Sequence, residues 1–362
     1  MKDGTQSHGV VIGRFMPPHN GHRYLLDFAA GCVDRLSVLV CTMQSDSIAG
    51  TLRYEWMKEM FPNINVVHMT EENPEARKGS PNSYRIWADA VLRYAGPVDY
   101  VFASEDYGFR LAEELDASYI PVDPSRRAFP VSATMVRRNP MGSWPFIPSC
   151  VRPYFARRVY VLSEQPGESD ALLEHLADHF RTVYAGDYLA YHAERTGSTV
   201  IDPAFAVRAQ IATENAIAKQ ADRILLSATD PVHVWMRLRA LAESDGAPGA
   251  SGVSGAGGVS RAGGVSAADG VSRAGGVSGA GAAPLGEPPK PRPKSEWARL
   301  RYLINPPTDA STATVYDPAR LPVLARTLEF LAEQGADVRV LAGSPEERFT
   351  QAMELVDEML LD

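Results

Sequence analysis

Short apolar stretches alternate with longer amphipathic ones along the first 150 residues. Runs rich in β-branched and aromatic residues, typical of buried strands, occupy 8–13, 36–42, 64–69, 98–104 and 117–123. Helical periodicity marks 21–32, 51–61 and 82–96. Short apolar strands that alternate with helices are typical of a parallel, doubly wound sheet. The pattern predicts an α/β domain over 1–150, with ligands bound at the carboxyl ends of its strands.

A second series of alternating elements fills 151–362. Apolar, strand-like runs occupy 157–163, 222–230, 299–307 and 336–343. Amphipathic, helix-like runs occupy 169–180, 204–221, 318–335 and 344–360. This pattern predicts a second domain, a three-layer α/β structure.

A low-complexity segment interrupts the second domain over 245–294. Its sequence repeats with a period of six from Gly252 to Gly281, and each unit carries one valine among Gly, Ala and Ser. Such units bury too little apolar surface to offset the entropy lost on ordering. We therefore expect a disordered insertion that continues into a proline-rich spacer.

Composition and charge narrow the class of protein. The 362 residues are 45% hydrophobic and 22% charged, as in soluble globular proteins, and the formal net charge is −8. This negative charge argues against nucleic-acid or anionic-membrane partners. The three cysteines lack metal-site spacing, and we find no leader and no membrane-spanning apolar run. We expect a cytoplasmic protein.

The loop after the first strand, GRFMPPHNGH over 13–22, carries the first chemical signal. His19 and His22 lie three residues apart at the predicted start of a helix. A zinc site needs three or four ligands, and no third histidine or cysteine lies nearby. The free N–H groups of a helix N-terminus attract an anion, and imidazole N–H groups and Arg14 would add to this attraction. The loop therefore predicts a phosphate-binding site.

A second basic motif, VSATMVRR, occupies 131–138. Ser132 or Thr134 would cap a helix, and Arg137 would follow one turn later on the same face. Taken alone, this motif also fits an ordinary capped helix.

The two motifs together resemble the nucleotidylyltransferase superfamily, which has an HxGH loop after its first strand and a later Ser/Thr-to-Arg helix start. The text between and after them, including SYRIWADAV and SWPFIPSCVRPYFARRV, resembles NadR-type bifunctional proteins. In that family a Rossmann-like nicotinamide mononucleotide (NMN) adenylyltransferase domain precedes a P-loop ribosylnicotinamide kinase domain. The resemblance implies transfer of the adenylyl group of ATP to NMN, which yields NAD and pyrophosphate.

The resemblance also implies roles for individual residues. His19, His22 and Arg137 would be catalytic, and ATP would be bound by Gly13, Arg14, Phe15, His19, Gly21, His22, Ser132, Thr134 and Arg137. NMN would contact Trp87, Arg53 and Arg126, with the indole of Trp87 stacked on the nicotinamide ring. Trp87 could instead be a core residue of its helix, and the two arginines could be solvated surface residues.

The resemblance extends to cofactor and partners. Mg²⁺ would accompany ATP without a dedicated protein metal site. The partners expected are the small molecules ATP and NMN, with a homo-oligomer left open. We also expect no DNA-binding segment, because only eight or nine residues precede the first strand.

The second domain departs from the family at its phosphate loop. GxxxxGK[ST] is expected between strand and helix, but this chain has SEQPGESD over 163–170. Glu168 replaces a glycine, Ser169 the lysine and Asp170 the metal-binding hydroxyl. These changes remove positive charge and add negative charge where phosphates would bind. We expect a degenerate kinase domain that has lost its activity.

Two other functions fit the same residues. One is adenylyl transfer to a different phosphate acceptor, such as phosphopantetheine. The other is a non-catalytic sensor of nicotinamide nucleotides.

Overall fold

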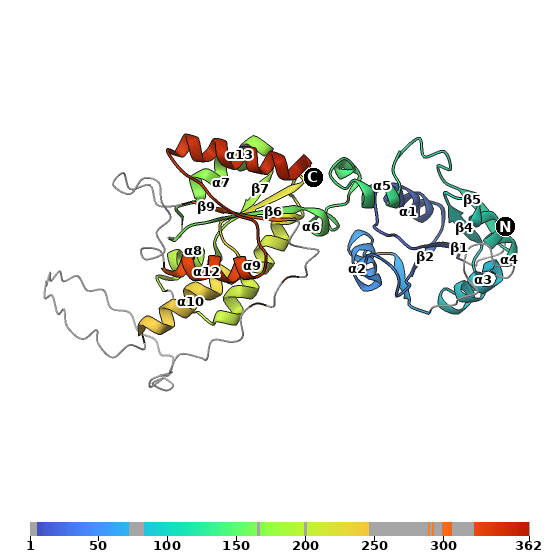
Figure 1. Ribbon diagram of the computed structural model, residues 1–362. Coiled ribbons are helices and arrows are strands. Elements are labelled where there is room, and N and C mark those ends of the chain that lie inside the picture. Colours follow the sequence, from blue (N-terminus) through green and yellow to red (C-terminus); the bar gives the residue numbers. More distant parts are fainter. Residues whose placement is uncertain are drawn as a thin grey trace, which may run out of the picture.

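The computed structural model describes two α/β units (Figure 1). It covers residues 6–71, 83–164, 167–198, 201–245, 289, 292, 299–305 and 322–361. Each unit contains one parallel five-stranded sheet with helices on both faces, which confirms the α/β class predicted from the sequence. The insertion expected over 245–294 lies outside the described residues, apart from Asp245, Pro289 and Arg292.

The first sheet has the strand order β3-β2-β1-β4-β5. Its strands are β1 (His8–Gly13), β2 (Arg35–Cys41), β3 (Asn65–Met69), β4 (Tyr100–Ala103) and β5 (Ser118–Pro121). The helices are α1 (Asn20–Cys32), α2 (Gly50–Met60), α3 (Ser83–Tyr94), α4 (Tyr107–Glu114), α5 (Ala133–Arg138) and α6 (Arg152–Phe155), with a 3₁₀ turn at Trp144–Phe146.

Alternating strand residues divide the first core into two layers. Val11 and Val38 pack with side chains of α1 and α2 on one face of the sheet. Val10 and Leu39 pack with α3 and α4 on the other face. The first of these layers extends to Ala156, slightly beyond the boundary expected at residue 150.

The second sheet has the order β10-β9-β6-β8-β7, again with every pairing parallel. Its strands are β6 (Arg157–Leu162), β7 (Val183–Ala185), β8 (Ile224–Ser227), β9 (Leu300–Ile304) and β10 (Val338–Val340). Its helices are α7 (Asp170–Phe180), α8 (Tyr188–Thr196), α9 (Pro203–Ala218), α10 (Pro231–Asp245), α12 (Pro322–Glu333) and α13 (Pro345–Leu361). The pattern analysis did not predict α4, β7, α8 or α10.

Helices α7 and α13 cover one face of the second sheet, and α8, α9, α10 and α12 cover the other (Figure 1). Val159 and Val161 of β6 face α7 and α13. Tyr160 and Leu162 belong to the layer that contains α12 side chains. The central strand therefore has two buried faces, which explains its nearly continuous apolar sequence.

The first strand of each unit is the middle strand of its sheet. Strand β1 lies between β2 and β4, and β6 lies between β8 and β9. The chain reverses its direction of winding at these strands, and ligands in open parallel sheets bind at the carboxyl end of such a position. The loops 14–19 and 163–169 both leave from there.

Within the parts of the chain that the structure describes, no helix is long and apolar enough to cross a membrane.

The layered core predicts a contrast between two leucines of the first unit. Leu26 is fully buried on α1, whereas Leu92 on α3 is 45% exposed. We expect Leu26→Ala to lower the free energy of unfolding by about 2–5 kcal/mol, because it leaves a cavity. Leu92→Ala should change it by about 0.5 kcal/mol or less. Urea unfolding followed by circular dichroism measures both, and equal effects would contradict this assignment of the core.

Candidate functional site

The loop that follows β1 turns sharply into helix α1. Phe15 has a φ of 46°, and its ring is buried in the core of the first unit. A Cβ on Gly13 would approach the Phe15 ring to 3.3 Å, so glycine allows this close turn. The side chain of Phe15 therefore anchors the loop, and its predicted contact with ATP could come only from its backbone.

His19 and His22 cap helix α1 reciprocally. His19 is the N-cap residue, and the backbone N–H of His22 donates to its Nδ1 at 3.4 Å. The backbone N–H of His19 donates to Nδ1 of His22 at 3.2 Å. This geometry is a capping box, with two imidazoles in place of the usual hydroxyl and carboxylate.

The cap selects one tautomer for each ring. An Nδ1 that accepts a hydrogen bond carries no proton, so a neutral imidazole must carry its proton on Nε2. The two rings stack with their centroids 3.7 Å apart. The pair therefore offers two Nε2–H donors at the N-terminus of a 13-residue helix.

Both imidazoles are held in the neutral form. Burial and the nearby Arg126 lower the pKa of His19 to about 4. Burial, His19 and Arg126 also hold the pKa of His22 well below its ordinary value. Positive charge on either ring would be repelled here, so an anion at this position would meet N–H donors, the helix dipole and arginine rather than imidazolium.

The backbone of Gly21 packs closely against the imidazole of His19. A Cβ at this position would meet Nδ1 of His19 at 3.0 Å and the side chain of Val131 at 3.5 Å. Glycine therefore allows the His19 ring to lie over the first turn of α1.

The buried side chain of Arg53 holds the loop after β1 in place. The side chain of this residue is fully buried, and its guanidinium donates to the backbone carbonyls of Arg14, Cys41 and Ile48 and to the carboxylate of Asp46. Those four bonds leave little donor capacity for a ligand. These contacts hold the loop in place, and the contact of Arg53 with NMN stays a prediction.

Arg14 pairs with the same carboxylate, that of Asp46, as Arg53 does. Its side chain is half exposed and forms an ion pair with the buried carboxylate of Asp46. Asp46 thus joins Arg14 to Arg53, a link that the sequence pattern gave no signal for.

Helix α5 brings the second motif to the first loop. Ser132 is its N-cap, and the hydroxyl accepts from the N–H of Met135 at 3.2 Å. Arg137 donates to Thr134 Oγ1 at 3.2 Å and to the backbone carbonyl of Met16. The motifs around His19 and Arg137 therefore meet at one edge of the sheet, although 110 residues separate His22 from Ser132.

The remaining predicted residues flank this edge. Arg126 has a φ of 53°, pairs with Glu105 at 3.0 Å and lies near enough to affect both histidines. Trp87 lies on α3, half-buried against the α3–α4 layer of the core. Stacking of Trp87 on a nicotinamide ring stays a prediction.

In the corresponding loop of the second unit, the described residues 163–164 and 167–169 make contacts with the rest of the protein. His233 Nε2 lies 3.2 Å from the carbonyl of Ser163, and Asn305 Nδ2 donates to the carbonyl of Glu168 at 3.0 Å. The carboxylate of Glu164 accepts from the N–H of Leu324 in the first turn of α12 at 3.1 Å. The carboxylate of Glu164 thus caps the N-terminus of helix α12.

Acidic groups surround the start of α7, which follows this loop. Burial and the neighbouring Glu174 and Asp187 raise the pKa of Asp170. A polyphosphate at this loop would lie close to these carboxylates, and the loss of kinase activity stays a prediction.

In the ranges that the structure describes, no group of three or more His, Cys, Asp or Glu side chains could hold a metal ion.

Comparison with known proteins gives two kinds of similarity. No protein-family model matches the chain. Over 199 residues, 50% of the chain, it is 27% identical to the trifunctional NAD biosynthesis/regulator protein NadR of Escherichia coli K12. It is 26% identical to the Salmonella typhimurium protein of the same description over the same length. The match covers 48% of each relative, so the chain spans about half the length of the curated relatives it matches.

Two crystal structures share the fold of nearly the whole chain. A NadR protein in complex with NR has a TM-score of 0.65 and 17% identity, covering 98% of this chain and 96% of that one. A NadR protein in complex with NAD and AMP-PNP has a TM-score of 0.64 and 15% identity, covering 99% and 97%. These findings support a NadR-type family. The sequence relation rests on half of the chain, and the NadR-type fold extends over both units.

The reciprocal cap predicts the protonation of two histidines. We expect long-range ¹H–¹⁵N NMR spectra to show His19 and His22 as Nε2–H tautomers at pH 7, with a His19 pKa near 4. Because unfolded histidine titrates near pH 6.5, these rings should lower the stability of the folded state as pH falls from about 6.5 to 4. An Nδ1–H tautomer, or titration of His19 near pH 6.5, would contradict the cap.

Proposed function

We propose that the first unit transfers the adenylyl group of ATP to NMN, forming NAD and pyrophosphate. The observation that carries the proposal is the bond from Arg137 to the carbonyl of Met16, which joins the two anion-binding motifs. The NadR-type similarity supports the choice of substrates, as do the related structures that contain NR, NAD and AMP-PNP.

The residues present suit an in-line displacement. A phosphate oxygen of NMN attacks the α-phosphorus of ATP, and the bond from that phosphorus to the bridging oxygen breaks. Pyrophosphate leaves with the electron pair, and no covalent enzyme intermediate forms. The protein's task is to position two anions and to stabilise the charge that develops between them.

The chain's own donors divide this task. The Nε2–H groups of His19 and His22 bind the phosphate oxygens at the α-phosphorus, helped by the N-terminus of α1. Arg137 and the hydroxyl of Ser132, which keeps its own proton available, bind the outgoing pyrophosphate. Arg126, on the same edge, completes the positive surface.

Magnesium enters this reaction as part of the substrate. We propose that Mg²⁺ would arrive on the triphosphate and would neutralise part of its charge.

We propose further that the second unit does not phosphorylate ribosylnicotinamide. The support is local: Glu164 caps α12, Asp170 sits in an acidic environment, and Ser169 stands where a lysine would reach the phosphates.

The proposed catalytic role of His19, as a donor to phosphate, can be separated from its structural role as the cap of α1. Asn is a good N-cap residue but lacks the imidazole donor, so His19→Asn should keep helix α1 folded. We expect it to lower kcat/KM for NAD formation roughly 10²–10³-fold, as for loss of a donor to developing charge. The control is His175→Ala, which replaces an exposed histidine of α7 and should leave kcat/KM unchanged. NAD formation is followed by chromatography.

Several outcomes of this assay would reject the proposal. Wild-type rates in His19→Asn would remove the histidine from the site. Faster reaction with phosphopantetheine than with NMN would favour a different acceptor. Tight binding of both nucleotides without product would favour a sensor.

The second unit is tested with ribosylnicotinamide, ATP and magnesium. We expect no NMN above background, while the same preparation converts NMN and ATP to NAD. Formation of NMN or ADP that depends on ribosylnicotinamide would show that the 163–169 loop still supports phosphoryl transfer.

A further inference from the structure

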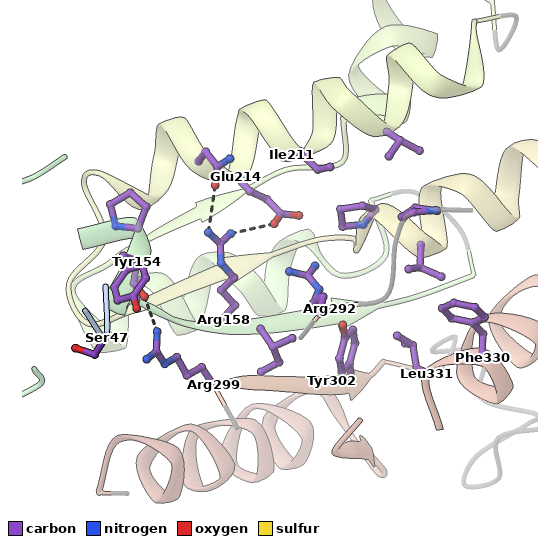
Figure 2. Close-up of a pocket in the computed structure, with 18 residues that line it drawn as sticks. Ser47, Tyr154, Arg158, Ile211, Glu214, Arg292, Arg299, Tyr302, Phe330 and Leu331 are labelled. Carbon is purple, nitrogen blue, oxygen red and sulfur yellow. Dashed lines mark hydrogen bonds and ion pairs between the residues drawn. The ribbon is translucent and has the colours of Figure 1, made fainter. Parts of the chain in front are cut away.

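A cavity of about 800 Å³ lies between the second sheet and helices α9 and α12, and Ser47 and Tyr154 of the first unit border one end of it (Figure 2). Arg158 near the start of β6 and Leu300 at the start of β9 line one end of it. The loop 163–169 leaves from the opposite end of β6. The polar end of this cavity is therefore separated from the phosphate-type loop by the length of a strand.

The carboxylate of Glu214 lines this cavity, and one of its two oxygens accepts no hydrogen bond from the described residues. Glu214 of α9 is 2% exposed, and its Oε2 accepts from Arg158 Nη1 at 3.1 Å and from the hydroxyl of Tyr160 at 3.0 Å. Its Oε1 has no hydrogen-bond partner among the described residues. Buried acceptors are almost always satisfied, so this oxygen calls for a donor from a ligand.

The burial of Glu214 has an electrostatic cost. Burial raises the pKa of its carboxyl to about 7, although Arg158 opposes this change. A donor on Oε1 would stabilise the charged form and reduce this cost.

The charges around Glu214 select a neutral donor. Arg158, Arg292 and Arg299 all line the cavity (Figure 2), and Arg292 pairs with the buried carboxylate of Asp230 at 2.9 Å. These guanidinium groups disfavour a cationic ligand, and the Glu214 carboxylate itself disfavours an anion at Oε1. An uncharged amide N–H satisfies both conditions.

The other end of the cavity is apolar. Phe330 and Leu331 of α12 lie at that end in Figure 2, and Ile211 of α9 lines the wall between the ends. A space of this volume accommodates a small organic molecule, and such walls suit an aromatic or apolar ring.

We propose that this cavity binds a small neutral ring compound that carries a primary amide group, with its N–H donating to Oε1 of Glu214. The ring lies against Ile211 and toward Phe330. This site lies in the second unit and is independent of the adenylyl transfer proposed for the first.

Three probes of one shape test the charge selection. These are 4-fluorobenzamide, 4-fluorobenzoate and 4-fluorobenzylamine, each titrated against the full-length chain by ¹⁹F NMR. We expect the amide to bind, with the anion and the cation roughly ten-fold weaker or more, as for loss of one buried hydrogen bond to a charged group. Equal binding of all three, or no binding of the amide at millimolar concentration, overturns the proposal.

Two substitutions on α9 locate the bound amide. Ile211→Trp should fill the cavity and abolish binding, and Ile211 is itself 41% exposed, so the change is tolerated at the surface. Phe205→Trp is the matched control, because Phe205 is 49% exposed on the same helix and does not line the cavity. Amide binding that survives Ile211→Trp places the ligand elsewhere and overturns the proposal. NAD formation, measured in the same variants, should be unchanged, which distinguishes this test from that of the first unit.

Discussion

The reciprocal hydrogen bonds between His19 and His22 are the constraint on which the first site depends. Each ring satisfies a backbone N–H that the start of helix α1 would otherwise leave unpaired. In doing so, each neutral ring keeps its proton on Nε2. One interaction therefore stabilises the start of the helix and selects the tautomers of both rings.

The sequence predicted the layered fold well where elements were long and periodic. Strands β1, β2 and β6 are buried on both faces, and their unbroken apolar runs revealed them. The missed strand β7 has three residues, too few for any periodicity to be recognised. Helix α10 was missed because it begins with a proline and mixes valines with a buried histidine, so that no single apolar face stands out.

The sequence pattern predicted a helix start at each of the two motifs but not all of the contacts made there. Ser132 is the cap that its local sequence favours, whereas the reciprocal cap of the two histidines was not predicted. Arg53 was assigned to NMN by the resemblance to the family. Whether an arginine meets solvent or backbone carbonyls depends on burial by elements distant in sequence, here the loop at Asp46. No local pattern encodes that environment.

The neutrality of the empty imidazole pair has a consequence for ligand binding. A phosphate placed against Nε2 of His19 or His22 supplies the negative charge that each ring lacks, and so raises the pKa from its depressed value. A second proton on either ring would have to add to Nδ1, which already accepts a backbone N–H of the cap. An anion at Nε2 would favour that proton, whereas the cap opposes it. Formation of an imidazolium at the first turn of α1 would therefore cost a hydrogen bond that holds the start of the helix.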